Sequence, residues 1–299
     1  MKSKKIKISG VGIHSGLPSE MSVRLTKTGG IVFVRNGIRI PARYNVASSR
    51  LQNTTIGEAP NHVQTIEHFM AALFVCGIRN MEIVINNTET PVLDGSADKF
   101  IKILSSLKIK DKRIFLRVKK EIVAERAEIK PPLFVRIMNF IKRRRWDGYV
   151  KLSPVKRNVL EVNARLIYGE EVIGDQSASF KFDYNDFQKS AKDFVKKIAK
   201  SRTFGKISEW EWLKRHGMGR GANESNVIAI DESGTGALNK LYYPDEFVRH
   251  KIIDATGDLY TSGYSIIGKL ESFKGSHALN NLVLRKLFSD PSNYDIIRL

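Results

Sequence analysis

The sequence predicts an α+β fold built from two units. Several strand patterns and two helix patterns occupy the first hundred residues, and a similar mixture recurs in the remainder. A chain of 299 residues is long enough for two ordinary domains. We therefore expect an N-terminal α+β domain at 1–108 and a C-terminal α+β domain at 115–299, joined by the charged stretch KIKDKRI at 108–114. No sequence repeat is strong enough to prove a duplication.

Alternating apolar residues, turn residues and helix endings mark the elements of the first unit. Asn36-Gly37 is the strongest hairpin signal. The apolar stretch at 65–76 is followed by Gly77, a common residue just after a helix. Strands are expected at 5–9, 21–25, 31–35, 38–40 and 81–85, helices at 65–76 and 99–104, a turn or bulge at 10–12 and a turn at 91–95.

The second unit repeats this mixture over a longer stretch. Strands are expected at 115–118, 160–163, 177–182 and 264–268. Helices are expected at 184–200, 207–215, 245–261 and 277–288. Because the second unit has its own strands and main helices, we expect it to resemble the first in topology.

The composition is that of a soluble globular protein with an unusually high positive charge. The chain is 42% hydrophobic and 27% charged, and its formal net charge is +19. Such a charge suits an anionic partner: nucleic acid, a phosphorylated small molecule or an anionic membrane surface. The basic residues peak in the amphipathic stretch 135–146, for which a solvated face and a lipid- or nucleotide-facing role both remain open.

Three features lead us to expect a cytoplasmic protein. No apolar run approaches the ~20 residues of a membrane span. The basic N-terminus MKSKKIKISGVG lacks the apolar segment of a secretory signal. The only cysteine, Cys76, cannot form an internal disulfide, which fits a reducing compartment.

The stretch FVRHKIIDATGDL at 247–259 carries a set of ionisable residues at helical spacing. Residues four apart share one helix face, so His250, Asp254 and Asp258 are nearly in line, with Lys251 beside them. One interpretation is a solvated stripe of ion pairs. The other is a metal site, because His250 and Asp254 could bind the same ion.

A second candidate pair, Glu67-His68, lies inside the apolar helix predicted at 65–76. Burying both groups is costly unless they find partners, so the pair is either a partly exposed polar edge or part of a site. In the second case His68 would bind a metal and Glu67 would handle a proton. A catalytic zinc takes three protein ligands, and His68, His250 and Asp254 would supply them. Lys251 would then face a substrate or oxyanion, and Asp258 would orient a histidine from another segment.

Six segments lie in order along nearly the whole chain and together resemble one family. They are SGVGIHSG (9–16), TIEHFMAAL (65–73), IRNMEIVINNTETPVLDGSADKF (78–100), SRTFG (201–205), YPDEFVRHKIIDATGDLYTSGYSIIG (243–268) and FKGSHALNN (273–281). Each alone is a weak signal. Jointly they resemble the UDP-3-O-acyl-N-acetylglucosamine deacetylases, zinc enzymes of the committed step of lipid A biosynthesis.

The resemblance implies a more detailed fold and site. Each domain layers a sheet on a pair of helices, and the helices of both domains pack face to face between the two sheets. The implied zinc ligands are His68, His250 and Asp254, with one Zn²⁺ per chain and Fe²⁺ as the alternative metal. Glu67 is the implied general base. His277 is the implied general acid or electrostatic partner at the departing amine, and Asp258 orients His277. Thr203 and Lys251 are implied to stabilise the oxyanion and to position the substrate.

The resemblance also implies the substrate, UDP-3-O-(3-hydroxyacyl)-N-acetylglucosamine, and its surroundings. Lys274 is expected near the nucleotide, Leu51 and Phe204 against the substrate, and an insert near 162–182 around the acyl chain. We expect a monomer that binds no nucleic acid, and the hypothesis for 135–146 is peripheral contact with an anionic membrane surface. Three departures from the family pattern put the acyl tunnel in doubt: Lys206 after TFG, Gly221-Ala222-Asn223, and the absence of a His-Pro pair in the insert.

Two other functions are kept as alternatives. The first is a zinc hydrolase of a different amide substrate on the same scaffold. The second is a non-enzymatic basic binding protein, in which Glu67, His68, His250 and Asp254 would be scattered surface residues without a metal.

Overall fold

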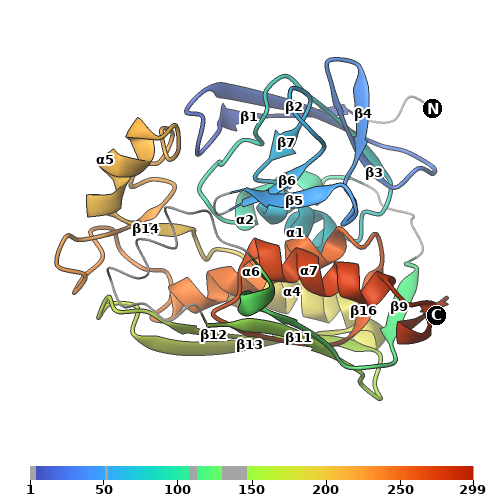
Figure 1. Ribbon diagram of the computed structural model, residues 1–299. Helices are drawn as coiled ribbons and strands as arrows, with labels where there is room; N and C mark the ends of the chain where they lie inside the picture. Colours follow the sequence, from blue (N-terminus) through green and yellow to red (C-terminus); the bar gives the residue numbers. More distant parts are fainter. Residues whose placement is uncertain (1–4, 51–52, 108–112, 130–146, 299) are drawn as a thin grey trace.

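The computed structural model of the protein describes residues 5–50, 53–107, 113–129 and 147–298. It shows a mixed α+β fold, as the sequence predicts, with helices layered between two β-sheets (Figure 1). One sheet and its helices come from the first third of the chain and the other sheet from the rest. The division into two domains of similar topology stays a prediction.

The first sheet has the strand order β1-β2-β8-β3-β4. Its inward side chains alternate with outward ones, as in β2, where Met21 and Val23 are fully buried. Asn36 and Gly37 both adopt left-handed backbone conformations and close the predicted β3–β4 hairpin. The strands are β1 (Lys5–Val11), β2 (Pro18–Leu25), β3 (Ile31–Arg35), β4 (Ile38–Pro41) and β8 (Met81–Ile85).

One local expectation for this unit was wrong, and one small sheet was missed. β1 continues through Gly10 and Val11, which pair with β2, so the turn begins at Gly12 and not at Gly10. A further small sheet, β5 (Ala47–Arg50), β6 (Asn53–Ile56) and β7 (Val63–Gln64), was not expected. β6 has the sequence NTTI and all four residues are buried, so it shows none of the polar–apolar alternation that marks a strand.

The second sheet is built around β16, which pairs with three strands. β16 runs parallel to β12 and β9 and antiparallel to β11. The predicted strands are present and mostly longer than expected, whereas β10, β11, β14, β15 and β17 were missed. The bounds are β9 (Phe115–Val118), β10 (Ile122–Glu125), β11 (Tyr149–Ser153), β12 (Val159–Ile167), β13 (Asp175–Asp183), β14 (Phe204–Lys206), β15 (Ile228–Ile230), β16 (Ser265–Phe273) and β17 (Tyr294–Ile297).

The predicted helices are present, with small shifts at their ends. The first begins at Glu67 because Thr65 has a positive φ of 59°, which a helix does not accommodate. Ser276 caps the last helix by accepting a hydrogen bond from the Leu279 backbone N–H. The helices are α1 (Glu67–Cys76), α2 (Asp98–Leu104), α4 (Phe187–Lys197), α5 (Ile207–Arg215), α6 (Glu246–Tyr260) and α7 (His277–Phe288), and short 3₁₀ turns are η1 (Arg126–Glu128), η2 (Tyr184–Asp186) and η3 (Pro291–Asn293).

Some predictions fall outside the residues that the structure describes. These are most of the linker, the basic stretch 135–146 and the substrate contact from Leu51. In the described ranges, no helix combines the length and the apolar character needed to cross a membrane.

Candidate active site

The two helices that carry most of the predicted site residues cross at a very short distance. A Cβ atom on Gly257 of α6 would lie 1.9 Å from the carbonyl oxygen of Glu67 on α1. Real Cβ atoms essentially never approach other atoms closer than 3.0 Å, so this crossing requires a glycine. The close approach sets His68 of α1 beside His250 and Asp254 of α6, although they lie far apart in the sequence.

His68, His250 and Asp254 form one compact group. Their ligand atoms all lie within 4.8 Å of one another. His68 Nε2 and His250 Nε2 lie 3.4 Å and 3.3 Å from the same atom, Asp254 Oδ1. Asp254 is 4% exposed, and His250 and Asp258 on the same helix face are 2% and 3% exposed. The interpretation of this face as a solvated stripe of ion pairs is therefore wrong.

The hydrogen bonding of His250 directs a lone pair at Asp254. His250 Nδ1 lies 3.1 Å from the carbonyl oxygen of Ser201, so Nδ1 carries the proton and donates. Burial lowers the pKa of His250 to about 3, so the ring is neutral at pH 7 and Nε2 is unprotonated. Asp254 Oδ1, which Nε2 faces, is buried and has no hydrogen-bond partner within the described ranges. The lone pairs of His250 Nε2 and Asp254 Oδ1 repel each other unless a cation lies between the two atoms, so the group fits a metal ion.

The spacing of the two histidines from Asp254 also fits a tetrahedral ion. Zinc bonds of about 2.0–2.2 Å at tetrahedral angles separate neighbouring ligand atoms by roughly 3.3–3.6 Å. The two distances to Asp254 Oδ1, 3.4 Å and 3.3 Å, agree with this separation. We interpret these contacts as neighbouring ligand atoms and not as ion pairs.

Lys251 places a positive charge next to this group. Its Nζ donates to Asp254 Oδ2 at 2.9 Å and lies 5.4 Å from the ring centroid of Phe204. Burial opposes the charged amine, but Asp254 together with Tyr168 and Glu67 outweighs burial and raises the pKa of Lys251. The amine is therefore charged at neutral pH and suits a developing oxyanion or an anionic part of a substrate.

Glu67 is buried at the start of α1, so the interpretation of Glu67-His68 as an exposed helix edge is also wrong. Glu67 is 3% exposed, and its Oε2 accepts a hydrogen bond from the backbone N–H of Thr54 at 3.0 Å. Burial raises the pKa of Glu67, while His277 and His68 oppose that shift. A carboxylate whose pKa is raised accepts a proton more readily near neutral pH, which suits a general base.

Asp258 and His277 form a buried pair on α6 and α7. His277 Nδ1 lies 2.8 Å from Asp258 Oδ2, which also accepts from the Asn280 side chain at 2.8 Å. Burial disfavours the charged ring, but the carboxylates of Asp258 and Glu67 outweigh burial and raise the pKa of His277 to about 10. His277 is therefore protonated at neutral pH, with its Nδ1–H donated to Asp258. A histidinium held in this way can deliver a proton to a leaving group.

Thr54 contacts both proton-handling groups and was missed from the sequence. Its backbone N–H binds Glu67, and its hydroxyl donates to Asp258 Oδ1 at 2.5 Å. The sequence LQNTTIG around Thr54 contains no recognisable motif, and only the pairing of β5, β6 and β7 places it there. Asn280 was also missed, although it lies within the FKGSHALNN segment.

The predicted substrate residues lie at different places around the site. Thr203 follows closely after Ser201, whose carbonyl holds His250, and its own backbone bonds Gly95 and Ile228. The Phe204 ring centroid lies 6.3 Å from that of His250. Lys274 Nζ forms an ion pair with Asp147 at 2.8 Å.

His14, in the SGVGIHSG segment, lies close enough to the site to sense its charge. Its backbone N–H donates to Glu89 at 2.9 Å, which anchors the β1–β2 turn. Burial lowers the pKa of His14, Glu89 opposes the shift, and the charge of His277 adds to it. The glycine-flanked motif was the sequence signal for His14, but no role followed from it.

Comparison with known proteins supplies a family for this arrangement. A family model described as UDP-3-O-acyl N-acetylglycosamine deacetylase matches residues 2–289. Curated relatives named UDP-3-O-acyl-N-acetylglucosamine deacetylase include a Campylobacter jejuni protein, which is 34% identical over 99% of this chain and 94% of its own length. A protein of the same name from Nitratiruptor sp. is 33% identical over 98% of this chain and 91% of its own. One from Sulfurovum sp. is 31% identical over 98% of this chain and 92% of its own length.

Proposed function

Because the chain belongs to the UDP-3-O-acyl N-acetylglycosamine deacetylase family, hydrolases of a C–N bond that is not a peptide bond, we propose that it removes the N-acetyl group of UDP-3-O-(3-hydroxyacyl)-N-acetylglucosamine in lipid A biosynthesis. The products are acetate and UDP-3-O-(3-hydroxyacyl)-glucosamine. The observation that carries the proposal is the buried His68–His250–Asp254 group with Glu67 and His277 beside it. Membership of an enzyme family excludes the non-enzymatic binding protein.

The metal we propose is one zinc ion per chain, held by His68, His250 and Asp254. Two histidines and one carboxylate leave a fourth tetrahedral position open, which is typical of catalytic zinc. Ferrous ion accepts the same ligands and is the second candidate. When bound, zinc supplies Lewis acidity, which polarises an amide carbonyl and lowers the pKa of water.

Glu67 and His277 move the two protons of the reaction in this proposal. Glu67 takes a proton from the attacking water, and its raised pKa matches that task. The amide nitrogen is a poor leaving group, so it must be protonated as the C–N bond breaks. His277 provides that proton while Asp258 holds the ring through Nδ1, which leaves Nε2 to face the substrate.

Lys251 and Thr203 stabilise the oxyanion that forms on the substrate carbonyl. The support for Lys251 is its charge and its position against Asp254. The support for Thr203 is its place in the segment whose Ser201 carbonyl orients His250. Donors held in place before the reaction stabilise developing charge without reorganising.

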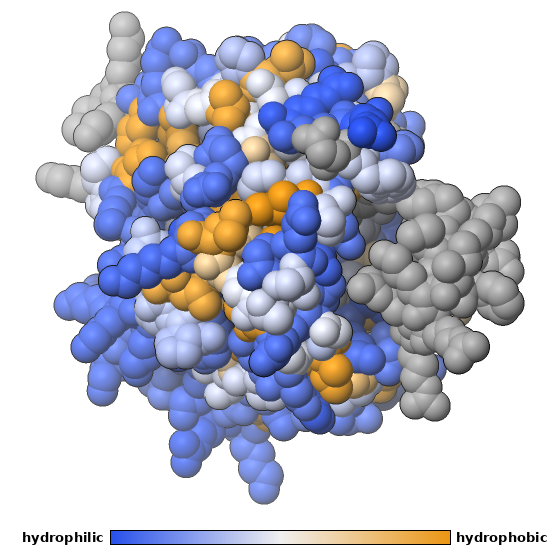
Figure 2. All heavy atoms as spheres, turned by 90° about the vertical axis from the view of Figure 1, so that its left-hand side faces the viewer, coloured by the Kyte–Doolittle hydropathy of each residue, from blue (hydrophilic) through white to orange (hydrophobic). Residues whose placement is uncertain are grey.

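Aromatic side chains suggest where the acyl chain lies. The ring of Phe204 lies near His250, with 6.3 Å between the ring centroids. The ring centroid of Tyr168 lies 6.0 Å from that of Phe204, and Tyr168 is 42% exposed. This series leads from the metal group towards the surface. Most of the predicted insert at 162–182 belongs to the paired strands β12 and β13, so we assign the acyl contact to the connecting turn at 168–174. The face that carries α5 shows hydrophobic patches among hydrophilic residues (Figure 2).

The remaining substrate contacts follow the family resemblance. We propose that Lys274 binds the diphosphate, for which its ion pair with Asp147 must open. Leu51 and Phe204 are proposed to contact the sugar or acyl part. We propose that the protein acts as a monomer.

Acetate release from UDP-3-O-acyl-N-acetylglucosamine tests the proposal. The zinc-loaded protein should release acetate, Glu67→Ala should abolish release, and elemental analysis should find one zinc per chain that is lost in His68→Ala. Turnover of a different amide but not of this substrate would support the alternative hydrolase. No turnover of this substrate by fully metal-loaded protein would refute the proposed activity.

A further inference from the structure

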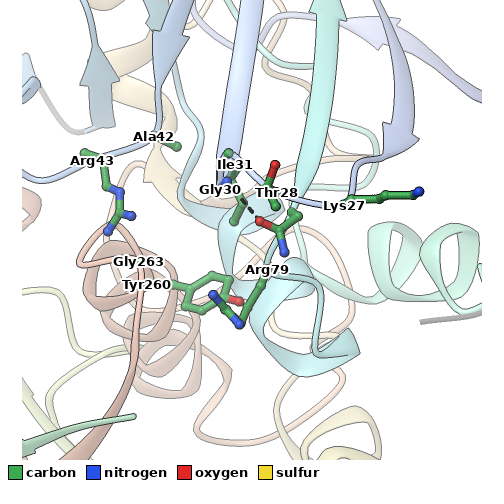
Figure 3. Close-up of a pocket in the computed structure, with 11 residues that line it drawn as sticks. Lys27, Thr28, Gly30, Ile31, Ala42, Arg43, Arg79, Tyr260 and Gly263 are labelled. Atoms are coloured by element: carbon green, nitrogen blue, oxygen red, sulfur yellow. Dashed lines mark hydrogen bonds between the residues drawn. The ribbon is translucent and has the colours of Figure 1, made fainter. Parts of the chain in front are cut away.

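A cavity lies at the end of α6 that is remote from the metal group. It has a volume of about 500 Å³ and is walled in part by Tyr260 and Gly263 (Figure 3). Tyr260 is the last residue of α6, and it lies about 9 Å along the helix axis beyond Asp254. The other walls come from the turn that leads into β3, the segment after β4 and the two residues just before β8. The cavity is therefore separate from the proposed catalytic centre.

The walls of this cavity are positively charged. Lys27, Arg43 and Arg79 line it, and none of the lining residues is acidic. Figure 3 shows the guanidinium groups of Arg43 and Arg79 on two sides of the cavity, whereas Lys27 points away from them. Two guanidinium groups that line one cavity can both donate hydrogen bonds to an anion that lies between them.

Arg43 is held in place before any ligand binds. Its Nη1 donates to the carbonyl oxygen of Ser262 at 2.6 Å, and its guanidinium lies 5.7 Å from the ring centroid of Tyr264. A Cβ atom on Gly263 would lie 1.6 Å from this Nη1, so the glycine leaves the space that the guanidinium occupies. A guanidinium has five N–H donors, and the bond to Ser262 uses one of them.

We propose that this cavity binds a phosphate-bearing small molecule, with the phosphate between Arg43 and Arg79. The planar fork of a guanidinium matches the oxygens of phosphate, and two forks can bind one phosphate from opposite sides. The volume exceeds what a phosphate group needs and lies within the range of small-molecule sites, so there is room for the group that carries the phosphate.

Isothermal titration of the metal-loaded full-length chain with inorganic pyrophosphate tests this site. Arg43→Gln and Arg79→Gln should each weaken pyrophosphate binding by about tenfold or more, the loss expected for a hydrogen bond to a charged group. Arg157→Gln, which removes an exposed arginine outside the cavity, should leave binding unchanged. If Arg43→Gln does not fold because it also loses the Ser262 contact, Arg79→Gln alone carries the test.

Lys274→Gln separates this cavity from the proposed catalytic cleft. Pyrophosphate binding that survives in Lys274→Gln and is lost in Arg79→Gln supports the second site. The reverse pattern, equal weakening by Arg157→Gln, or no binding at all would overturn it. Tighter binding of uridine monophosphate than of inorganic phosphate, with the same dependence on Arg79, would assign a nucleoside phosphate, whereas equal binding would assign the phosphate group alone.

Discussion

Replacing Gly257 by alanine should separate the two helices that hold the metal group. The new Cβ would lie 1.9 Å from the Glu67 carbonyl oxygen, and contacts below 3.0 Å essentially never occur, so the helices must move by about 1 Å. Metal ligand distances tolerate only about ±0.2 Å. Alanine normally stabilises a helix interior by about 1 kcal/mol relative to glycine, but overpacking costs about 1–3 kcal/mol.

We therefore expect Gly257→Ala to lose zinc affinity by about tenfold or more, because each 1.4 kcal/mol corresponds to about a factor of ten. Its melting temperature should also fall. Competition with a fluorescent zinc chelator measures the affinity, and calorimetry measures the melting temperature. Gly169→Ala is the control, because a Cβ there meets no atom within 4 Å. Unchanged zinc affinity together with a higher melting temperature in Gly257→Ala would refute the helix-crossing argument.

Three further predictions concern the proton-handling groups and the metal. Thr54→Val removes the hydroxyl bonded to Asp258 and should lower kcat for acetate release by about tenfold. Thr54→Ser and the neighbouring Thr55→Val should retain the wild-type kcat, and equal losses in both valine variants would contradict the assigned contact. In metal-free protein, the raised pKa of His277 adds to the free energy of unfolding in full below about pH 6.5, and this contribution is lost as pH rises through about 10. Urea unfolding should show that the free energy of unfolding falls with pH, and His277→Gln should flatten this dependence. Removing zinc with a chelator should lower the melting temperature, because the buried acceptors around Asp254 then face each other without a cation, and adding zinc back should restore it. A melting temperature that does not change with zinc would argue against the site.

Local sequence signals predicted the helices well. α5 and α7 have the bounds expected from their apolar periodicity, and α7 begins just after Ser276, a strong capping residue. The Asn36-Gly37 turn was predicted equally well, because only a few residues tolerate its left-handed backbone. These features depend on interactions within a few residues, which the sequence displays directly.

Strands whose burial comes from distant partners were not predicted. β6 buries the polar stretch NTTI, and its hydrogen bonds come from β5, β7 and the side chains of the site. β11 is paired on both sides, by β10 and β16, and β16 lies far along the chain. Nothing in the local pattern of either strand records these partners.

The sequence by itself determined which residue types share one helix face. The i,i+4 spacing of His250, Asp254 and Asp258 depends only on the geometry of a helix. It did not decide whether that face is solvated or buried, and both alternatives were open until the family segments were considered together. The tertiary structure decided that question by packing α1 against α6.

That contact also decided which groups act together. Gly257 permits the approach that sets His68 against His250 and Asp254, and the small sheet places Thr54 between Glu67 and Asp258. Burial keeps His250 neutral, whereas the carboxylates of Asp258 and Glu67 keep His277 charged against the effect of burial. The chemistry of a site depends on distances and dielectric between residues remote in sequence, and only the folded chain sets these.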